Sequence, residues 1–248
     1  MRIGSCEYQG SILRDSNLRT SKISPITTES LSTIKRLMSG QAKGDFTCIT
    51  TDQTGFMIVC GTSLGEILEC DTQAMKVYKY NMGSDVITTV DLSLDKRFIA
   101  AGNSCGQIMY KRTSNKWGSK VVTDKHKRPI VAVRFTEAGE VLVITDSSLQ
   151  KIRYIYYKLY IEHQILEILT EARNLSQIEV AYFEGHEVVT VASLEEVHIL
   201  STKPKLEILL TLKRPDYVQE SVPCVSWCKS GDISEEKSIL CIIFWHKF

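Results

Sequence analysis

The sequence lacks an excess of charge of either sign, and it lacks long apolar runs. Thirty basic residues balance twenty-nine acidic ones, so the formal net charge is +1. Such a chain has no general field to attract nucleic acid or an anionic membrane, and we expect neither as a direct partner. No apolar run is long enough to cross a bilayer, and Met1–Gly10 lacks the basic and then apolar order of a signal peptide. We therefore expect a cytoplasmic protein.

Clustered metal ligands are also missing. The eight cysteines are mostly spread singly through apolar runs, as reduced core thiols are, and the five histidines include no H-x-x-x-H pair. Cys224 and Cys228 are the closest cysteines, but no second Cys/His pair stands near them. Two core thiols are therefore favoured over a zinc site. We predict no metal, no cofactor and no small-molecule substrate.

Sequence patterns of catalysis are absent as well. The segment Gly61-Thr-Ser-Leu-Gly65 lacks the lysine and the glycine spacing of a P-loop, which favours a hairpin. No serine lies in a G-x-S-x-G elbow, and no cysteine has a histidine close to it in the sequence. We predict no catalytic residues and a protein that is not an enzyme.

Residues 1–44 are rich in Ser and Thr and show little periodicity, which predicts a flexible N-terminal segment. A short helix is possible over Leu31–Met38, where apolar residues have helical spacing. After Gly44 the pattern changes to short alternating apolar runs separated by Gly, Asp, Asn and Ser. This pattern predicts an all-β domain over residues 45–248.

A repeat of 41 residues begins that domain. The segment from Asp45 aligns without a gap on the segment from Val86. Two glycines and three aliphatic residues fall on their counterparts: Ile49 on Val90, Ile58 on Ile99, Gly61 on Gly102, Gly65 on Gly106 and Ile67 on Ile108. The repeat length matches the roughly 40 to 45 residues of a four-stranded propeller blade.

The two copies predict the same strands and the same glycine turns. The expected strands are Thr47–Thr50, Met57–Gly61 and Glu66–Cys70 in the first copy, and Thr88–Leu92, Phe98–Gly102 and Gln107–Lys111 in the second. We predict that Gly61 and Gly102 end the second strand of each copy at a tight turn. Gly65 and Gly106 are predicted to supply the positive φ of a short hairpin. All four glycines are thus predicted to be structural.

A third copy runs from Pro129 to about Tyr156, with Thr145 and Leu149 where the paired glycines are expected. Later strands are expected at Ile178–Phe183, Val188–Ser193, Val197–Leu200, Leu206–Leu212, Val222–Cys228 and Ile239–Trp245. The span Tyr157–Glu171 suits a helix or a strand, and the propeller context favours a strand.

The 204 positions from residue 45 to residue 248 hold about five blades of this length. We therefore predict a WD40-like β-propeller of divergent four-stranded blades. Because the sequence stops in the apolar run Ile242–Trp245, the propeller is expected to be incomplete.

Loops between the expected strands hold the candidate partner-binding residues. The basic cluster Lys125, Lys127 and Arg128 suits a solvated inter-blade loop better than a phosphoinositide site, because the double-arginine motif of lipid-binding propellers is missing. His126 stands at the distance from the next strand at which WD blades place a histidine that hydrogen-bonds within the blade, so a structural role is expected. Trp117, Arg214 and Tyr217 complete the set.

A narrower likeness is carried by the order of several short motifs. The first part has Gly61-Thr-Ser-Leu-Gly65, Ala101-Gly102, Gly106-Gln107-Ile108, Asp124-Lys-His126 and Val133-Arg-Phe135-Thr136. The later part has Ala192-Ser193-Leu194, Lys203-Pro204-Lys205-Leu206 and Val222-Pro223-Cys-Val-Ser-Trp227. In this order they resemble the N-terminal propeller of the vacuolar protein sorting-associated protein 8 family, over most of residues 45–248.

The resemblance implies a function in membrane tethering. Members of that family are cytosolic subunits of the CORVET complex, which joins early endosomal membranes and binds Rab5-type GTPases. The resemblance implies that this propeller binds a Rab-type GTPase or other tethering-complex subunits. It also implies that the protein associates peripherally with endosomal or vacuolar membranes. A generic WD40 adaptor and, from another class, a propeller hydrolase or lyase remain the alternatives; the last requires convergent ionisable groups at the central channel.

Overall fold

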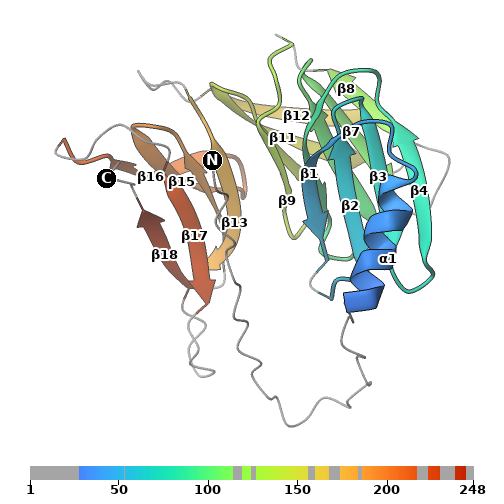
Figure 1. Ribbon diagram of the computed structural model, residues 1–248. Coiled ribbons are helices and arrows are strands. Elements are labelled where there is room, and N and C mark those ends of the chain that lie inside the picture. Colours follow the sequence, from blue (N-terminus) through green and yellow to red (C-terminus); the bar gives the residue numbers. More distant parts are fainter. Residues whose placement is uncertain are drawn as a thin grey trace.

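The computed structural model describes residues 28–52, 54–113, 119–123, 127–155, 160–167, 174–183, 186–216, 223–229 and 238–243. Within these ranges the chain forms one helix and eighteen strands (Figure 1). The first two sheets are built from β1 (Phe46–Thr51), β2 (Met57–Thr62), β3 (Glu66–Asp71) and β4 (Lys76–Asn81), and from β5 (Ile87–Leu92), β6 (Phe98–Asn103), β7 (Gln107–Arg112) and β8 (Lys120–Thr123).

The third and fourth sheets repeat this plan, and a fifth sheet has two described strands. The third sheet holds β9 (Ala132–Phe135), β10 (Val141–Ile144), β11 (Ser148–Ile155) and β12 (Tyr160–Glu167). The fourth holds β13 (Gln177–Phe183), β14 (His186–Ala192), β15 (Glu196–Ser201) and β16 (Glu207–Lys213). The last is formed by β17 (Cys224–Lys229) and β18 (Ser238–Ile243).

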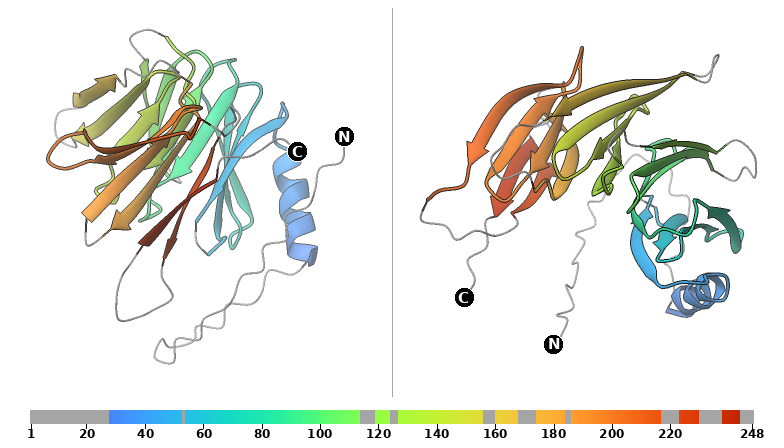
Figure 2. Two further views of the ribbon diagram at one scale, coloured as in Figure 1. Left: turned by 90° about the vertical axis from the view of Figure 1, so that its left-hand side faces the viewer. Right: turned by 90° about the horizontal axis from the view of Figure 1, so that it is seen from above.

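Each sheet is an antiparallel meander in chain order, and the first strands of successive sheets lie side by side. The sheets stand along an open arc with the first sheet at one end and β17–β18 at the other (Figure 2). This is the arrangement of propeller blades, with β1, β5, β9, β13 and β17 as inner strands. The predicted all-β propeller of four-stranded blades is confirmed, and we number the blades 1 to 5.

Hydroxyl groups connect neighbouring inner strands. Thr47 in β1 donates its Oγ1 hydrogen to the carbonyl of Ile87, and Thr88 in β5 donates to the carbonyl of Ile130. β1, β5 and β9 belong to separate sheets, so these side chains provide hydrogen bonds between blades that no backbone ladder supplies. The two threonines are 41 residues apart and show that the sequence repeat is a repeat of contacts.

Gly61 and Gly102 have a different role from the one predicted. Each lies inside its strand, one residue before the end, and neither has a positive φ. A Cβ on Gly61 would stand 2.4 Å from Cγ2 of Ile87, and a Cβ on Gly102 would stand 2.4 Å from Cγ2 of Ile130. These glycines therefore allow one blade to approach the inner strand of the next blade.

Gly65 and Gly106 lie in the hairpins between the second and third strands, with φ of +74° and +77°. Their missing side chains also leave space for the chain that enters the next blade. A Cβ on Gly65 would stand 2.3 Å from the carbonyl oxygen of Gly83, and one on Gly106 would stand 2.7 Å from that of Arg128. Conformation and close packing thus both require glycine.

Blade 3 has lost one residue from this hairpin. Ile144 pairs with Leu149 as Gly102 pairs with Ile108, so Ile144 occupies the position of the first glycine. The predicted match of Thr145 and Leu149 to the two glycines is therefore wrong. No residue of the shorter loop between β10 and β11 has a positive φ, which is why no glycine is needed there.

Two outer strands, β4 and β8, were not among the expected strands. Both are half-exposed, so their apolar residues do not form the continuous runs that mark the buried strands. The ambiguous span Tyr157–Glu171 contains β12, which pairs with β11 as a strand. The predicted strand in that region is thus confirmed.

Helix α1 (Thr28–Ser39) packs on blade 1 and confirms the short helix considered over Leu31–Met38. Ile34 and Met38 are buried against Cys60, Leu68 and Cys70. Residues 28–39 of the segment predicted to be flexible therefore form a helix whose apolar face is buried on the sheet.

Candidate protein-interaction surface

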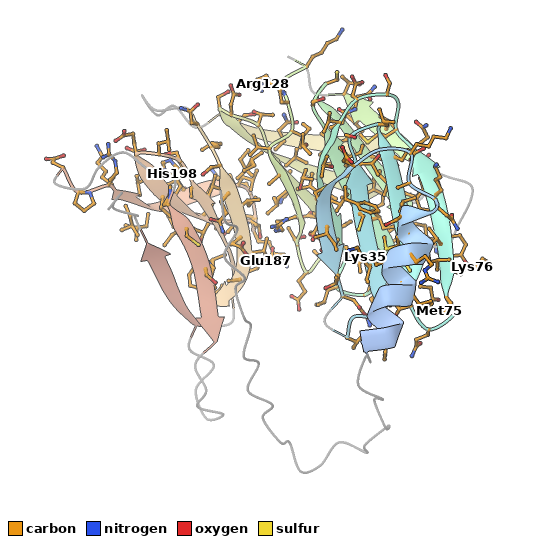
Figure 3. All side chains as sticks on the ribbon, viewed as in Figure 1. Lys35, Met75, Lys76, Arg128, Glu187 and His198 are labelled. Atoms are coloured by element: carbon orange, nitrogen blue, oxygen red, sulfur yellow. The ribbon has the colours of Figure 1, made fainter. Side chains whose placement is uncertain are left out.

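Lys127 and Arg128, two of the basic residues predicted to bind partners, lie just before the first strand of blade 3. Figure 3 labels Arg128. Lys127 is exposed, with φ of +54°. Arg128 is half-buried and joins the start of blade 3 to the next hairpin: its Nη1 donates to Ser147 Oγ at 2.7 Å and its Nη2 to Ser148 Oγ at 3.0 Å. Arg128 thus stabilises the fold, and Lys127 is the cation that faces solvent.

Arg214 is also occupied by a contact within its own blade. Its Nη2 lies 2.8 Å from both carboxylate oxygens of Glu195, in the hairpin between β14 and β15. Its backbone amide donates to the carbonyl of Glu195 at 2.7 Å. The side chain therefore closes the end of blade 4. The other sequence candidates, Trp117, Lys125, His126 and Tyr217, lie outside the described residues.

Ionisable residues occupy one repeat position on three successive inner strands: Asp91, Arg134 and Glu179. Asp91 Oδ2 accepts a hydrogen bond from the amide of Phe135 at 2.7 Å. Burial raises the pKa of Asp91, and this hydrogen bond and the charge of Arg134 oppose the rise. Because Asp91 bonds to the backbone of β9, its carboxylate serves to connect two inner strands.

The thiols and potential metal ligands show no assembled centre in the described part of the chain. No group of three or more His, Cys, Asp or Glu side chains there could hold a metal ion. Cys60 and Cys70 are buried beneath α1, and burial raises the pKa of Cys60 to about 12. These two thiols are core residues and stay protonated at neutral pH.

A cleft of about 400 Å³ opens between blades 2 and 3, at the C-terminal ends of β5 and β9, whereas Arg128 precedes the start of β9. One wall is the turn between β5 and β6, with Ser93, Leu94, Asp95, Arg97 and Phe98, and the other is the turn between β9 and β10, with Thr136, Glu137, Ala138 and Gly139. Tyr110 completes the lining, and its ring centroid lies 5.1 Å from that of Phe98. Sequence reasoning missed this site because its two walls come from different blades.

The cleft carries more acidic than basic side chains. Asp95 Oδ1 accepts from Ser93 Oγ at 2.7 Å, and Asp95 Oδ2 accepts from Arg97 Nε at 2.6 Å. Burial alone would raise the pKa of Asp95, but the hydrogen bonds from Ser93 and Arg97 outweigh it and hold the pKa below its usual value. Asp95 is thus a carboxylate at neutral pH, and Glu137 and Arg97 are the other acidic and basic residues that line the cleft.

A second accessible surface is the outer strand of blade 4. Ile208, Leu209 and Leu210 of β16 are all exposed, and Leu209 retains 59% of its accessible surface. Leu209 lies at an irregularity in the pairing of β15 with β16. Three consecutive exposed aliphatic residues on an edge strand are typical of a surface that another protein covers.

The sequence as a whole matches one protein family. Residues 16–245 match the family model described as the Vps8 beta-propeller. The chain belongs to this family. The resemblance inferred from the short motifs is therefore confirmed, and the propeller described above is a Vps8-type propeller. No curated protein sequence matches it.

A solved structure supports the fold of this Vps8-type propeller. The β-propeller domain of Cps50 (Swd1) from Myceliophteria thermophila superposes with a TM-score of 0.59 at 12% identity. The match covers 75% of this chain and 59% of that chain, so the Vps8-type propeller spans somewhat over half of its neighbour's length. At this identity the similarity shows the fold alone. Among the described residues, the one helix is too short and polar to span a bilayer.

Proposed function

We propose that this chain is a non-catalytic scaffold subunit in endosomal or vacuolar vesicle tethering and protein sorting, whose propeller binds a Rab-type GTPase or other tethering-complex subunits. The match of residues 16–245 to the Vps8 propeller carries the proposal. In it, residues 45–248 are the interaction module, and the protein reaches endosomal or vacuolar membranes peripherally, through its partners.

The distribution of side chains supports a binding role over a catalytic one. Asp91 bonds to the backbone of β9, and Arg128 and Arg214 are engaged within the fold. In contrast, the aliphatic residues of β16 and the walls of the cleft between blades 2 and 3 face solvent. A rigid scaffold with accessible edges is how propellers present surfaces to other proteins.

The proposal is tested by binding of the full chain to purified components. We expect immobilised residues 1–248 to retain tethering-complex subunits, or a GTP-loaded Rab-type GTPase in preference to its GDP-loaded form. Recovery of neither, with an unrelated set of partners in their place, would instead support a generic WD40 adaptor.

A pair of surface variants locates the interaction. Leu209→Asp places a charge on the exposed strand of blade 4, and Val121→Asp makes the same change on the outer strand of blade 2, where Val121 is 46% exposed. We expect Leu209→Asp to reduce retention about ten-fold or more and Val121→Asp to leave it unchanged. Equal retention by both variants would move the interface away from β16.

A further inference from the structure

The turns that join the first two strands of blades 1, 2 and 3 are built alike. In each, the amide of the fourth residue donates to the carbonyl of the first: Gly55 to Asp52 at 3.1 Å, Lys96 to Ser93 at 2.8 Å and Gly139 to Thr136 at 3.0 Å. The fourth residues have φ of +70°, +60° and +77°. Gly55, Lys96 and Gly139 therefore occupy the same position of the repeat.

At the junction of blades 1 and 2, Lys96 reaches back to the preceding turn. Its ammonium forms an ion pair with the carboxylate of Asp52 and donates to Thr54 Oγ1 at 3.2 Å. Thr54 and Asp52 are themselves hydrogen-bonded. The carboxylate of Asp52 and the hydroxyl of Thr54, two residues apart, thus form an acceptor pair that binds the ammonium of a lysine from the next blade.

At the junction of blades 2 and 3, the acceptor pair is present, but no lysine stands at the position equivalent to Lys96. Ser93 and Asp95 stand at the positions of Asp52 and Thr54, with the hydroxyl and the carboxylate exchanged, and they are hydrogen-bonded at 2.7 Å. The residue at the position of Lys96 is Gly139, and a Cβ placed there would meet nothing within 4 Å. The unfilled space is part of the cleft of about 400 Å³.

We propose that this cleft binds a lysine side chain presented by a peptide segment of a protein partner. The ammonium lies beside Asp95, where the repeat places the ammonium of Lys96 at the neighbouring junction. Phe98 and Tyr110 also line the cleft, and aromatic rings attract cations. The proposal rests on the proposed function, since it names the chemistry by which the scaffold recognises a partner.

The charges around the cleft favour a cation. Glu137 is exposed and makes no side-chain ion pair with a described residue, so its carboxylate is available to a ligand. Arg97 contacts Asp95 through Nε and Oδ2 at 2.6 Å, on an exposed edge. Asp95 Oδ2 accepts this one bond among the described residues, so it retains capacity for the incoming ammonium.

The test uses two short peptides and the full chain. N-acetyl-Gly-Lys-Gly-amide is titrated into isotope-labelled residues 1–248, and the amide signals of residues 93–98 are followed by NMR. The norleucine counterpart has an apolar side chain of similar length and no charge. We expect saturable shifts with the lysine peptide at a dissociation constant of about 1 mM, and binding about ten-fold weaker with norleucine.

A variant that fills the cleft from within provides the second measurement. In Gly139→Lys the chain supplies the side chain that the repeat predicts, so we expect the lysine peptide to bind about ten-fold more weakly. Gly139→Ala places a side chain at the same positive φ without a cation and should bind as the natural protein does. Glu137→Gln should weaken binding about three-fold.

Three results would overturn the proposal: equal binding of both peptides, which indicates an apolar anchor; no shift at residues 93–98 with either peptide; or unchanged lysine-peptide binding by Gly139→Lys. These outcomes are separable from a failure of the proposed function. If the chain still retains tethering-complex subunits while the peptide does not bind, the scaffold role stands and the lysine site falls.

Discussion

The backbone of Gly61 in blade 1 lies against the side chain of Ile87 in blade 2, so that a Cβ on Gly61 would stand 2.4 Å from Cγ2 of Ile87. Gly102 makes the same approach to Ile130 in blade 3. Both isoleucines are fully buried and have little freedom to move. At these two junctions the distance between neighbouring blades therefore depends on the absence of one methyl group.

Adding that methyl group should destabilise the propeller. We expect Gly61→Ala or Gly102→Ala to lower the free energy of unfolding by about 1–3 kcal/mol, because the clash forces Ile87 or Ile130 out of its packed position. Urea unfolding followed by tryptophan fluorescence measures the change. An unfolding midpoint equal to that of the natural protein would show that the blades are further apart than described.

Two glycines with the same φ separate conformational strain from collision. Gly65 and Gly139 have φ of +74° and +77°, but a Cβ on Gly65 would lie 2.3 Å from the carbonyl oxygen of Gly83, whereas one on Gly139 would meet nothing within 4 Å. Gly139→Ala should cost about 1 kcal/mol from the backbone conformation alone. Gly65→Ala should cost about 2 kcal/mol more. Equal costs would show that the contact with Gly83 is not rigid.

The same glycines show how far the sequence could predict the fold. The 41-residue spacing of Gly61 with Gly102, and of Gly65 with Gly106, located two blades and their hairpins. It could not distinguish a turn glycine from one that is needed for close packing. The partner of that packing, Ile87, belongs to the next blade and is visible only when the blades are assembled.

Blade 3 marks the point where the repeat lost predictive value. One residue is missing from the loop between Thr145 and Ser148, so a fixed spacing placed Leu149 at a turn, although it pairs with Ile144 in the sheet. The candidate site was less predictable still. The sequence predicts Arg128 as a partner-binding residue of a solvated loop, but its guanidinium donates to two serines of the next hairpin.

A buried lysine joins blades 3 and 4 and should be costly to remove. Lys151 Nζ donates to the carbonyl of Thr202 at 2.8 Å and lies 3.4 Å from Oε2 of the buried Glu140. Lys151→Met keeps the length of the side chain but leaves that carbonyl and carboxylate without their shared cation. We expect a loss of about 3 kcal/mol in chemical unfolding.

Lys205→Met is the matched control for this change. The ammonium of Lys205 lies 3.9 Å from Glu207, and both side chains are exposed. We expect a change within about 0.5 kcal/mol, since exposed ion pairs contribute little. If the two methionine variants were equally stable, Lys151 would not connect the blades as described.

The junction of blades 1 and 2 should respond to pH. Burial alone would raise the pKa of Asp52, but bonds from Lys96, Thr54 and the amide of Met57 outweigh it and hold the pKa below its usual value. The carboxylate therefore stabilises the fold above about pH 4, and this contribution is lost as the pH falls through the lowered pKa.

Asp52→Asn removes that contribution at every pH. We expect it to lower the free energy of unfolding by about 1 kcal/mol at pH 7. The difference from the natural protein should shrink as the pH is lowered from about 4 to about 2. Thermal unfolding of both proteins across this range measures it, and a difference that stays constant with pH would rule out Asp52 as the titrating group.

The inner strands of blades 1 and 2 provide the sharpest test of which sheet faces are covered. Ile49 and Val90 occupy one position of the repeat, 41 residues apart. Val90 is 3% exposed because blade 1 packs on it, whereas Ile49 on the corresponding face of β1 is 66% exposed. We expect Val90→Asp to destabilise residues 1–248 by about 4 kcal/mol or more, because it buries an unpaired carboxylate.

Ile49→Asp should change the stability of the same chain by less than about 0.5 kcal/mol, since its carboxylate stays in water. Both variants replace a β-branched aliphatic residue by Asp at equivalent backbone positions, so the effects of β-propensity and of the added charge largely cancel in the comparison. The difference between them measures what the neighbouring blade contributes. If Ile49→Asp proved as destabilising as Val90→Asp, another part of this chain would have to cover the face of β1 that carries Ile49. The arc of blades would then be closed on that side.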